Sequence, residues 1–318
     1  MDNFVKWFQS TGAYWNPNIG LCQFPNMGNG LVALDDLQKG EVLFTIPKRA
    51  IISAQKPGWN HLIIKIIEER KDLMSFWRPY LDIIPSDLST CRSWPEDDRV
   101  LLKGTDIYEN DLKHMADPYL RFKLKTGFEC TEREFYFAAD FISAYSFSLD
   151  DGSPMMVPMA DMLNHSDENN ACLQGDMKTM KMVCTRMIRK GEQIFNTFGG
   201  LSDGELLLKY GFVIGDHQNK HNSVMIMREQ VTEFAGRRVT FPDCVKLKLS
   251  TKTRRVHRLF LINRLSFKKY IQWRLSKYHD FTSPPNSSDQ VTRRRWHLSK
   301  HVVNTEKEIL HYHLSQCG

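Results

Sequence analysis

The residues with the clearest chemical potential stand together just past the middle of the chain. A short apolar run, Met155 to Met159, suits a buried strand, and Asp161, Asn164 and His165 follow it directly. Polar side chains placed where a strand leaves the core can bond to a bound molecule. The Asn164–His165 pair is therefore a candidate ligand site, although a histidine held by hydrogen bonds within a turn gives the same pattern.

A second candidate lies near the start of the chain, in the glycine-rich sequence Met27-Gly28-Asn29-Gly30. Glycine has no Cβ, so a backbone rich in glycine can approach a ligand closely. A purely structural turn would explain the two glycines equally simply. A glycine-rich turn and a strand within 27–33, then a Lys39-Gly40 turn and a second strand at 42–47, predict a hairpin-like unit here.

Further elements must hold these two stretches in place. Strands are predicted at 178–184 and 193–198, and Ser202-Asp203-Gly204-Glu205 matches a capping box that opens a helix from Glu205 to Tyr210. Gly211 stands where such a helix usually ends. The remaining patterns predict helices at 1–12, over much of 53–133, and at 132–147, 256–275 and 291–314, strands at 223–227 and 245–249, and a loop at 281–290.

Three blocks within residues 154–212 carry a family resemblance: MVPMADMLNHS, GEQIFNTFG and ELLLKYGF, in that order. This order resembles the catalytic half of SET-domain protein methyltransferases. It is most similar to the class typified by the plant Rubisco large-subunit lysine methyltransferase. The phrases ISAYSF and FNTFG resemble the branch of that class that modifies ribosomal proteins and a transcription-factor subunit.

The resemblance implies an α+β fold in two parts. The first part, residues 1–215, would be a SET domain of small, pseudoknot-like sheets, with a helical insertion at about 53–133. The second part, residues 216–318, would be a basic and mainly helical lobe that resembles the class's substrate-binding lobe. The length of 318 residues accommodates two domains at roughly 100–200 residues each.

The resemblance also implies S-adenosylmethionine as the methyl donor and a lysine of another protein as the acceptor. The residues that match donor contacts of the family are Met27, Gly28, Asn29, Tyr145, Asn164 and His165. Asp161 and Tyr210 match positions near the substrate, and Tyr210 and Phe198 match the catalytic end of the lysine channel. Three of these residues also have a simpler structural explanation. Tyr145 and Tyr210 could pack in the core, and Asp161 could cap a helix or form a turn.

Phe198 departs from the family pattern. Where the class has a tyrosine in Asn-Thr-Tyr-Gly, this chain has Asn196-Thr197-Phe198-Gly199, which supplies the ring without the hydroxyl. Losing one preorganised polar group typically costs about 3 kcal/mol of transition-state stabilisation. We therefore keep two alternatives to lysine methylation: a weak or inactive SET-fold module that binds proteins, and a histidine-directed methyltransferase.

Charge is distributed unevenly along the chain. Residues 219–318 hold 20 Lys and Arg against 7 Asp and Glu, a net charge of +13, whereas the first 218 residues carry −7. A basic half could meet an acidic surface, or its cations could simply solvate helices. We expect a monomer that acts on a protein and binds neither nucleic acid nor membrane.

The cysteines and the apolar stretches exclude other classes. The seven cysteines form no CxxC pair, so neither a disulfide framework nor a metal site is expected. The first twelve residues do not resemble a secretory signal, and no window approaches the ~18 apolar residues of a membrane helix. We expect a location in the cytoplasm, the nucleus or both.

Overall fold

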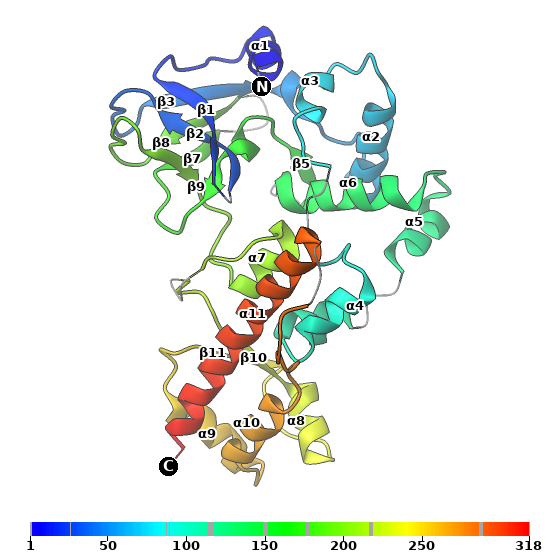
Figure 1. Ribbon diagram of the computed structural model, residues 1–318, viewed down its shortest axis with the longest axis vertical. Coiled ribbons are helices and arrows are strands. Elements are labelled where there is room, and N and C mark those ends of the chain that lie inside the picture. Colours follow the sequence, from blue (N-terminus) through cyan, green and yellow to red (C-terminus); the bar gives the residue numbers. More distant parts are fainter. Residues whose placement is uncertain are drawn as a thin grey trace. The chain divides into compact units, whose positions relative to one another are not determined.

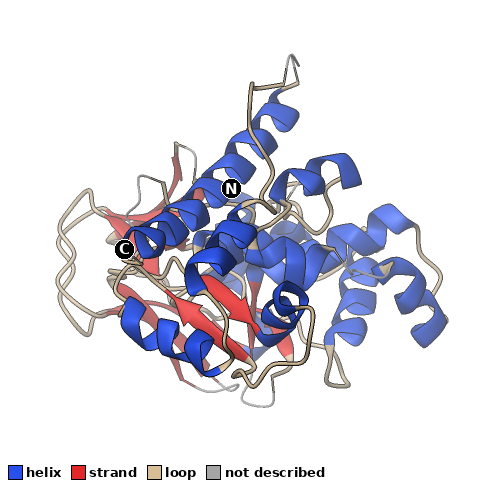
Figure 2. Ribbon diagram, turned by 90° about the horizontal axis from the view of Figure 1, so that it is seen from below, coloured by secondary structure: helices blue, strands red, loops and turns tan. Residues whose placement is uncertain are grey.

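The computed structural model describes residues 2–25, 27–86, 88, 90–113, 117–148, 152–175, 179–215, 219–285 and 289–317 (Figure 1). Its contacts divide the chain into two compact units. Unit 1 comprises residues 1–88 and 117–200, and unit 2 comprises 89–116 and 201–318. Strands are short wherever they occur, whereas helices are numerous and often longer (Figure 2).

Unit 1 begins with the expected amphipathic helix, α1 (Asp2–Ser10), which buries Phe4, Trp7 and Phe8. Two antiparallel strands follow, β1 (Ile19–Phe24) and β2 (Gly28–Ala33). Strand β1 was not predicted. The glycines expected to form a turn lie instead within β2, where Gly28 pairs with Phe24 and Gly30 with Cys22.

The predicted hairpin between 27–33 and 42–47 is wrong, because its two strands belong to different sheets. β2 pairs with β1 on one side and with β9 (Gln193–Asn196) on the other. β3 (Val42–Pro47) pairs with β8 (Thr179–Cys184), and β7 (Ala171–Gly175) extends that sheet. The turn between β2 and β3 crosses from one sheet to the other, since Leu37 bonds to Ile188 and the Gly40 amide to the Cys184 carbonyl.

The strand predicted at Met155 to Met159 is shorter than expected. β5 (Pro154–Met156) pairs with β4 (Ser146–Ser148), and Met156 also bridges to Ile52. Pro158 has no N–H to donate and Met159 takes a φ of 76°, so the chain turns there into the 3-10 turn η4 (Ala160–Met162). Strands β8 and β9 confirm the predictions at 178–184 and 193–198, except that Lys178 lies outside the described residues.

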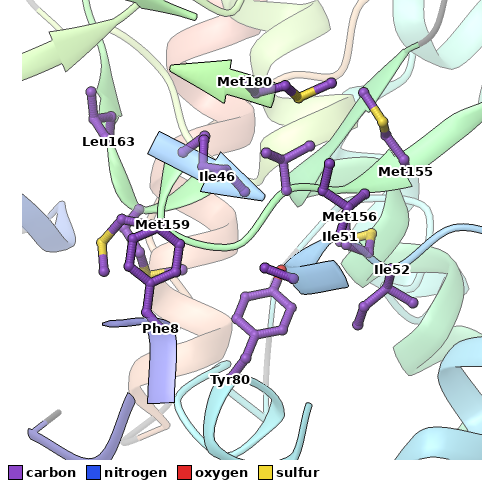
Figure 3. Packing of buried hydrophobic residues seen from close by; sticks show 14 of the residues in the cluster. Phe8, Ile46, Ile51, Ile52, Tyr80, Met155, Met156, Met159, Leu163 and Met180 are labelled. Carbon is purple, nitrogen blue, oxygen red and sulfur yellow. The ribbon is translucent and has the colours of Figure 1, made fainter. Parts of the chain in front are cut away.

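Four helices complete unit 1: α2 (Trp59–Lys71), α3 (Arg78–Leu81), α5 (Pro118–Thr126) and α6 (Glu132–Tyr145). A Thr131–Glu134 capping box opens α6. The predicted apolar stripe of α6 is confirmed, with Phe135, Ala138 and Ile142 buried. Figure 3 shows the core that these elements share, in which Tyr80 of α3 joins Phe8, Met156 and Met159.

Unit 2 combines the middle of the predicted helical insertion with the C-terminal residues. The insertion contributes α4 (Glu96–Arg99), the 3-10 turn η2 (Val100–Leu102) and the π-helical turn η3 (Tyr108–Leu112). The long helix α11 (Gln290–Ser315), red in Figure 1, contacts η2 and α4. This division differs from the domain boundaries that the sequence suggested at 215 and at about 53–133, which remain a prediction.

Helix α7 (Asp203–Tyr210) confirms the prediction made from its capping box. Ser202 and Glu205 exchange the two expected hydrogen bonds, and Gly211 closes the helix at a φ of 78°. Strands β10 (Val224–Met227) and β11 (Cys244–Leu247) pair antiparallel near the predicted positions, and α8 (Arg228–Ala235) connects them. Local sequence signals were sufficient for α7, β10 and β11, whereas α8 was not predicted.

The single helix predicted at 256–275 is wrong, because two helices occupy that range. α9 (Thr253–Ile262) and α10 (Phe267–Leu275) are separated at Asn263, whose side-chain amide donates to the carbonyls of Leu259 and Thr240. Arg264 then takes a φ of 55°, and the Ser266 hydroxyl caps α10. Among the described helices, none is long and apolar enough to span a membrane.

Candidate functional site

The candidate site of unit 1 is assembled at one edge of a small sheet whose strand order is β1-β2-β9-β6. The two-residue strand β6 (Asn164–His165) runs parallel to β9, with Asn164 opposite Phe195 and His165 opposite Asn196. Leu163 before β6 is buried, so the polar pair begins where the chain emerges from the core. The sequence placed this pair correctly at the end of buried structure.

Asn164 connects this edge to the glycine-rich strand. Its side-chain Nδ2 donates to the backbone oxygen of Asn29, 3.2 Å away. A Cβ at Gly30 would lie 2.8 Å from that nitrogen and 2.9 Å from the Phe24 ring, which is closer than real Cβ contacts allow. Gly30 is therefore required for Asn164 to approach β2, and the two predicted stretches meet here.

The neighbouring positions on β2 are partly open. Met27 is 53% exposed and Gly28 is exposed with a φ of 74°. The side-chain oxygen of Asn29 is buried and has no hydrogen-bond partner among the described residues. A buried amide oxygen without a donor is unfavourable, so this atom is suited to accept a hydrogen bond from a ligand.

His165 uses its side chain to hold the loop after β9. Its Nδ1 accepts the backbone N–H of Phe198 at 3.0 Å, and the two rings stack with centroids 5.2 Å apart and planes 29° apart. Nδ1 must be unprotonated to accept this bond. The His165 side chain therefore has the hydrogen-bonded role that the sequence left open. Its backbone belongs to strand β6, which pairs with β9.

Asn170 is a residue of the site region that the sequence did not indicate. Its buried side chain accepts from the Phe195 amide at 2.7 Å and donates to the Gln193 carbonyl at 2.9 Å. Both partners belong to β9, so Asn170 fixes the strand that carries the neighbours of Asn164. An asparagine five residues after β6 begins a turn as often as it supports a strand, and no local signal distinguishes the two.

Asp161 lies inside a second cluster, with two tyrosines. The Tyr80 hydroxyl donates to Asp161 Oδ2, and burial raises the pKa of Asp161 to about 8 against the lowering effect of that bond. Its Oδ1 has no partner of standard geometry, although the backbone amides of Asp161 and Met159 lie near enough to lower the pKa. Among the residues that the structure describes, this shielded carboxyl group therefore has no cation as a partner.

Tyr145 lies beside this carboxyl group at the end of α6. Burial and then the charge of Asp161 raise the pKa of Tyr145 to about 12. Its ring packs against Phe141, and Phe141 packs against Tyr80. The structure thus places Tyr145 near Asp161, while its predicted contact with the donor stays a prediction. Tyr80 lies within the predicted helical insertion, and its bond to Asp161 was not expected from the sequence.

Tyr210, the remaining predicted site residue, belongs to unit 2. It occupies the last turn of α7, where its ring lies 6.2 Å from that of Phe212, and burial raises the pKa of its hydroxyl. Its predicted place at the lysine channel stays a prediction, as does the catalytic role of Phe198.

Comparison with known proteins identifies the family. A SET-domain family model matches residues 28–199, which is more than half of the chain. The N-lysine methyltransferase setd6 of Salmo salar is 31% identical over 279 residues, covering 74% of this chain and 62% of that protein. The Danio rerio protein of the same name is 32% identical over 259 residues, which cover 67% of this chain and 56% of that protein. The chain thus spans about 60% of the length of these relatives.

Solved structures show the same fold. The SET domain of LSMT bound to lysine and AdoHcy superposes with a TM-score of 0.68 at 18% identity, covering 99% of this chain and 90% of that one. The structure of Rubisco LSMT bound to AdoMet superposes with a TM-score of 0.67 at the same sequence identity. The α+β SET fold with small sheets and many helices is confirmed. The chain belongs to the SET-domain family, within the class that its sequence resembles.

Proposed function

We propose that this protein transfers a methyl group from S-adenosylmethionine to a lysine side chain of another protein. The observation that carries the proposal is the junction of β2 and β6, where Asn164 reaches Asn29 across Gly30. Relatives named N-lysine methyltransferase support the same activity. The junction joins the two sequence stretches that the family uses to hold the donor.

The residues at this junction fit the donor. The unpartnered Asn29 oxygen can accept a hydrogen bond from an amine or hydroxyl group, and the neighbouring residues Met27 and Gly28 are exposed. Asn164, His165 and Tyr145 complete the proposed contacts. When bound, S-adenosylmethionine supplies a methyl group on a positively charged sulfur, ready for in-line transfer to an amine.

The remaining groups would prepare the acceptor. A lysine has an ordinary pKa of about 10.4, and burial between aromatic rings favours loss of its proton. Phe198, whose ring and backbone are held by His165, would provide one such wall. Alignment of the two reactants at about 3–3.5 Å supplies most of the acceleration, so few charged catalytic groups are needed.

Asp161 would act on the substrate side. Its Oδ1 is shielded from solvent and no described cation lies beside it, so a substrate ammonium group could supply the missing positive charge. In its neutral form the same group can donate a hydrogen bond instead. Tyr80 would then hold Asp161 in position through its hydroxyl group, without contacting the substrate itself.

A second candidate function is a protein-binding module that has lost catalysis. Phe198 favours this candidate. His165 stacks on the Phe198 ring and accepts the Phe198 backbone N–H, so the ring is held in place. What is missing at this position is the hydroxyl group that the family's tyrosine contributes to catalysis. A histidine-directed transferase is a third candidate, since a phenylalanine wall does not select lysine by hydrogen bonding.

Transfer of labelled methyl from S-adenosylmethionine to proteins of a cell extract tests the proposal, with the modified residue mapped by mass spectrometry. Label on lysine supports it, and label on histidine selects the third candidate. If donor binds in calorimetry but no protein in any extract is labelled, the binding module is the better description.

We further propose, from the sequence alone, that the substrate is a ribosomal or nuclear protein and that the enzyme acts as a monomer in the cytoplasm or nucleus. Identification of the labelled protein tests the substrate class. Light scattering tests the monomer, and imaging of the tagged protein tests the location.

A further inference from the structure

Residues 244–279, here called the basic segment, contain 11 Lys and Arg and no Asp or Glu. Two of these cations are ion-paired, Arg274 with Asp106 and Lys277 with Glu233. The other nine have no ion pair with any residue that the structure describes. They are Lys246, Lys248, Lys252, Arg254, Arg255, Arg258, Arg264, Lys268 and Lys269. So many like charges on one segment repel one another unless an anionic partner is bound.

Helix α9 displays the densest part of this charge. Its inner residues Val256 and Phe260 are buried in the core of unit 2. On the opposite, solvent-facing side of the helix, Arg254, Arg255 and Arg258 are exposed. Leu261 and Ile262 follow them at the end of the helix and are 58% and 70% exposed. The outward α9 face, as defined by these five residues, therefore combines unpaired cations with an adjoining aliphatic pair.

We propose that the outward α9 face binds an acidic segment of a partner protein that carries an aliphatic or aromatic side chain beside its carboxylates. Carboxylates would pair with the three arginines, which present planar guanidinium groups suited to two-point hydrogen bonding. The apolar side chain would cover Leu261 and Ile262, whose exposure is otherwise unfavourable. The proposal concerns binding by unit 2 and is independent of methyl transfer.

Two other anionic partners fit the face less well. A membrane-binding helix inserts its apolar face, but that face of α9, with Val256 and Phe260, is already buried in the protein. Nucleic acid would pair with the arginines and leave Leu261 and Ile262 uncovered. The large exposed apolar residues described in the basic segment are Leu249, Leu261 and Ile262, which are aliphatic and offer no ring for base stacking.

A peptide-binding experiment with the full chain tests the proposal. The probe is a fluorescent peptide of Asp and Glu residues with two leucines, read by anisotropy. The variant Arg254→Glu/Arg258→Glu is compared with Arg121→Glu/Lys125→Glu on α5, which reverses two exposed cations at the same helical spacing. We expect the α9 variant to weaken binding by about tenfold and the α5 variant by less than about twofold.

A second peptide, with serines in place of the leucines, tests the apolar part. The variant Leu261→Ser/Ile262→Ser should bind the leucine peptide about threefold more weakly than wild type. Its affinity for the serine peptide should be unchanged. Equal losses in the α9 and α5 charge variants would overturn the proposal. So would tighter binding of wild type to a thymidine oligonucleotide or to phosphatidylserine vesicles. All variants are first matched to wild type by circular dichroism and donor-binding calorimetry, so that a misfolded variant or a failed donor site is recognised separately.

Discussion

The two units hold shielded carboxyl groups in different ways: Asp106 of unit 2 pairs with a cation, whereas Asp161 of unit 1 pairs with none of the cations that the structure describes. In unit 1, Asp161 is bonded by the Tyr80 hydroxyl. In unit 2, Arg274 pairs with Asp106 at 3.1 Å, and the Met225 amide donates to the same carboxylate at 2.6 Å. Burial raises the pKa of Asp106 only to about 6, because Arg274 opposes it, whereas the pKa of Asp161 reaches about 8.

A second carboxyl group belongs to the unit 2 cluster. Glu306 of α11 accepts the Asp106 backbone N–H and the Tyr278 hydroxyl, and burial raises its pKa well above the ordinary value. We infer that this cluster is structural: it ties residue 106, α10 and α11 into one unit. Asp161 has no cation beside it among the described residues, and that difference supports the substrate-side role proposed for it.

Removing the cation should have the largest effect. Arg274→Met leaves the buried carboxyl groups uncompensated, so the free energy of unfolding should fall by about 3–5 kcal/mol. Urea denaturation followed by fluorescence measures it. Lys277→Met, which breaks the exposed pair with Glu233, should cost less than about 1 kcal/mol. Equal effects in the two variants would mean that the unit 2 cluster is not structural.

The pH dependence of stability should come next. The pKa of Asp161 is about 8 in the folded protein and near 4 when unfolded, so the folded state binds the proton more tightly. Stability from this group is complete below about pH 4 and is lost as pH rises to about 8. Four pKa units correspond to about 5 kcal/mol, and because solvent reaches part of the residue we expect a smaller change, on the order of 3 kcal/mol. Asp161→Asn should flatten that part of the stability curve.

Tyr80→Phe is the control for this measurement. It removes a hydrogen bond that lowers the pKa of Asp161, so the loss of stability with rising pH should extend to higher pH. A wild-type curve that rises between pH 4 and 8, with no difference in Asp161→Asn, would contradict the comparison of the two clusters.

Donor affinity should respond to Asn164. Asn164→Ala removes the bond to Asn29 while the fold is kept, and S-adenosylmethionine should bind about tenfold more weakly in calorimetry. The matched control is Asn169→Ala, because Asn169 also donates to a backbone carbonyl, that of Ala171, but outside the β2–β6 junction. Undiminished affinity in a folded Asn164→Ala protein would remove the junction from the donor site.

The smallest expected effect concerns Phe198. Phe198→Tyr restores a hydroxyl that matters most in the transition state, so turnover should rise by about fivefold, or the number of methyl groups change, with donor affinity unchanged. Phe128→Tyr adds the same atom to a partly buried ring elsewhere in unit 1. A slower Phe198→Tyr enzyme would mean that the surroundings have adapted to phenylalanine.

Local signals predicted local structure well. The capping box at Ser202, the cap at Gly211 and the stripe along α6 each depend on neighbours within a few residues. The family blocks also located the Asn164–His165 pair. In each case the information and the contact lie in the same short stretch of chain.

Contacts between distant residues account for the errors. β2 pairs with β9 instead of β3, and Asn263 ends α9 because it bonds to Thr240, far along the chain. The bond between Tyr80 and Asp161 joins residues 81 positions apart. Hydrophobic periodicity reports which face is buried and does not specify the partner, so these pairings were beyond a single sequence.

The pairing of β2 with β9 also sets when the β2–β6 junction can form during synthesis. Leu31 leaves the ribosome long before Ile194, its partner in the sheet. At about 5–20 residues per second, the glycine-rich strand waits on the order of ten seconds or more with one edge unpaired. β1 covers its other edge in the meantime. The nascent chain is therefore most open to misassembly or to chaperone binding in this interval, and slowed translation between residues 34 and 193 would lengthen it.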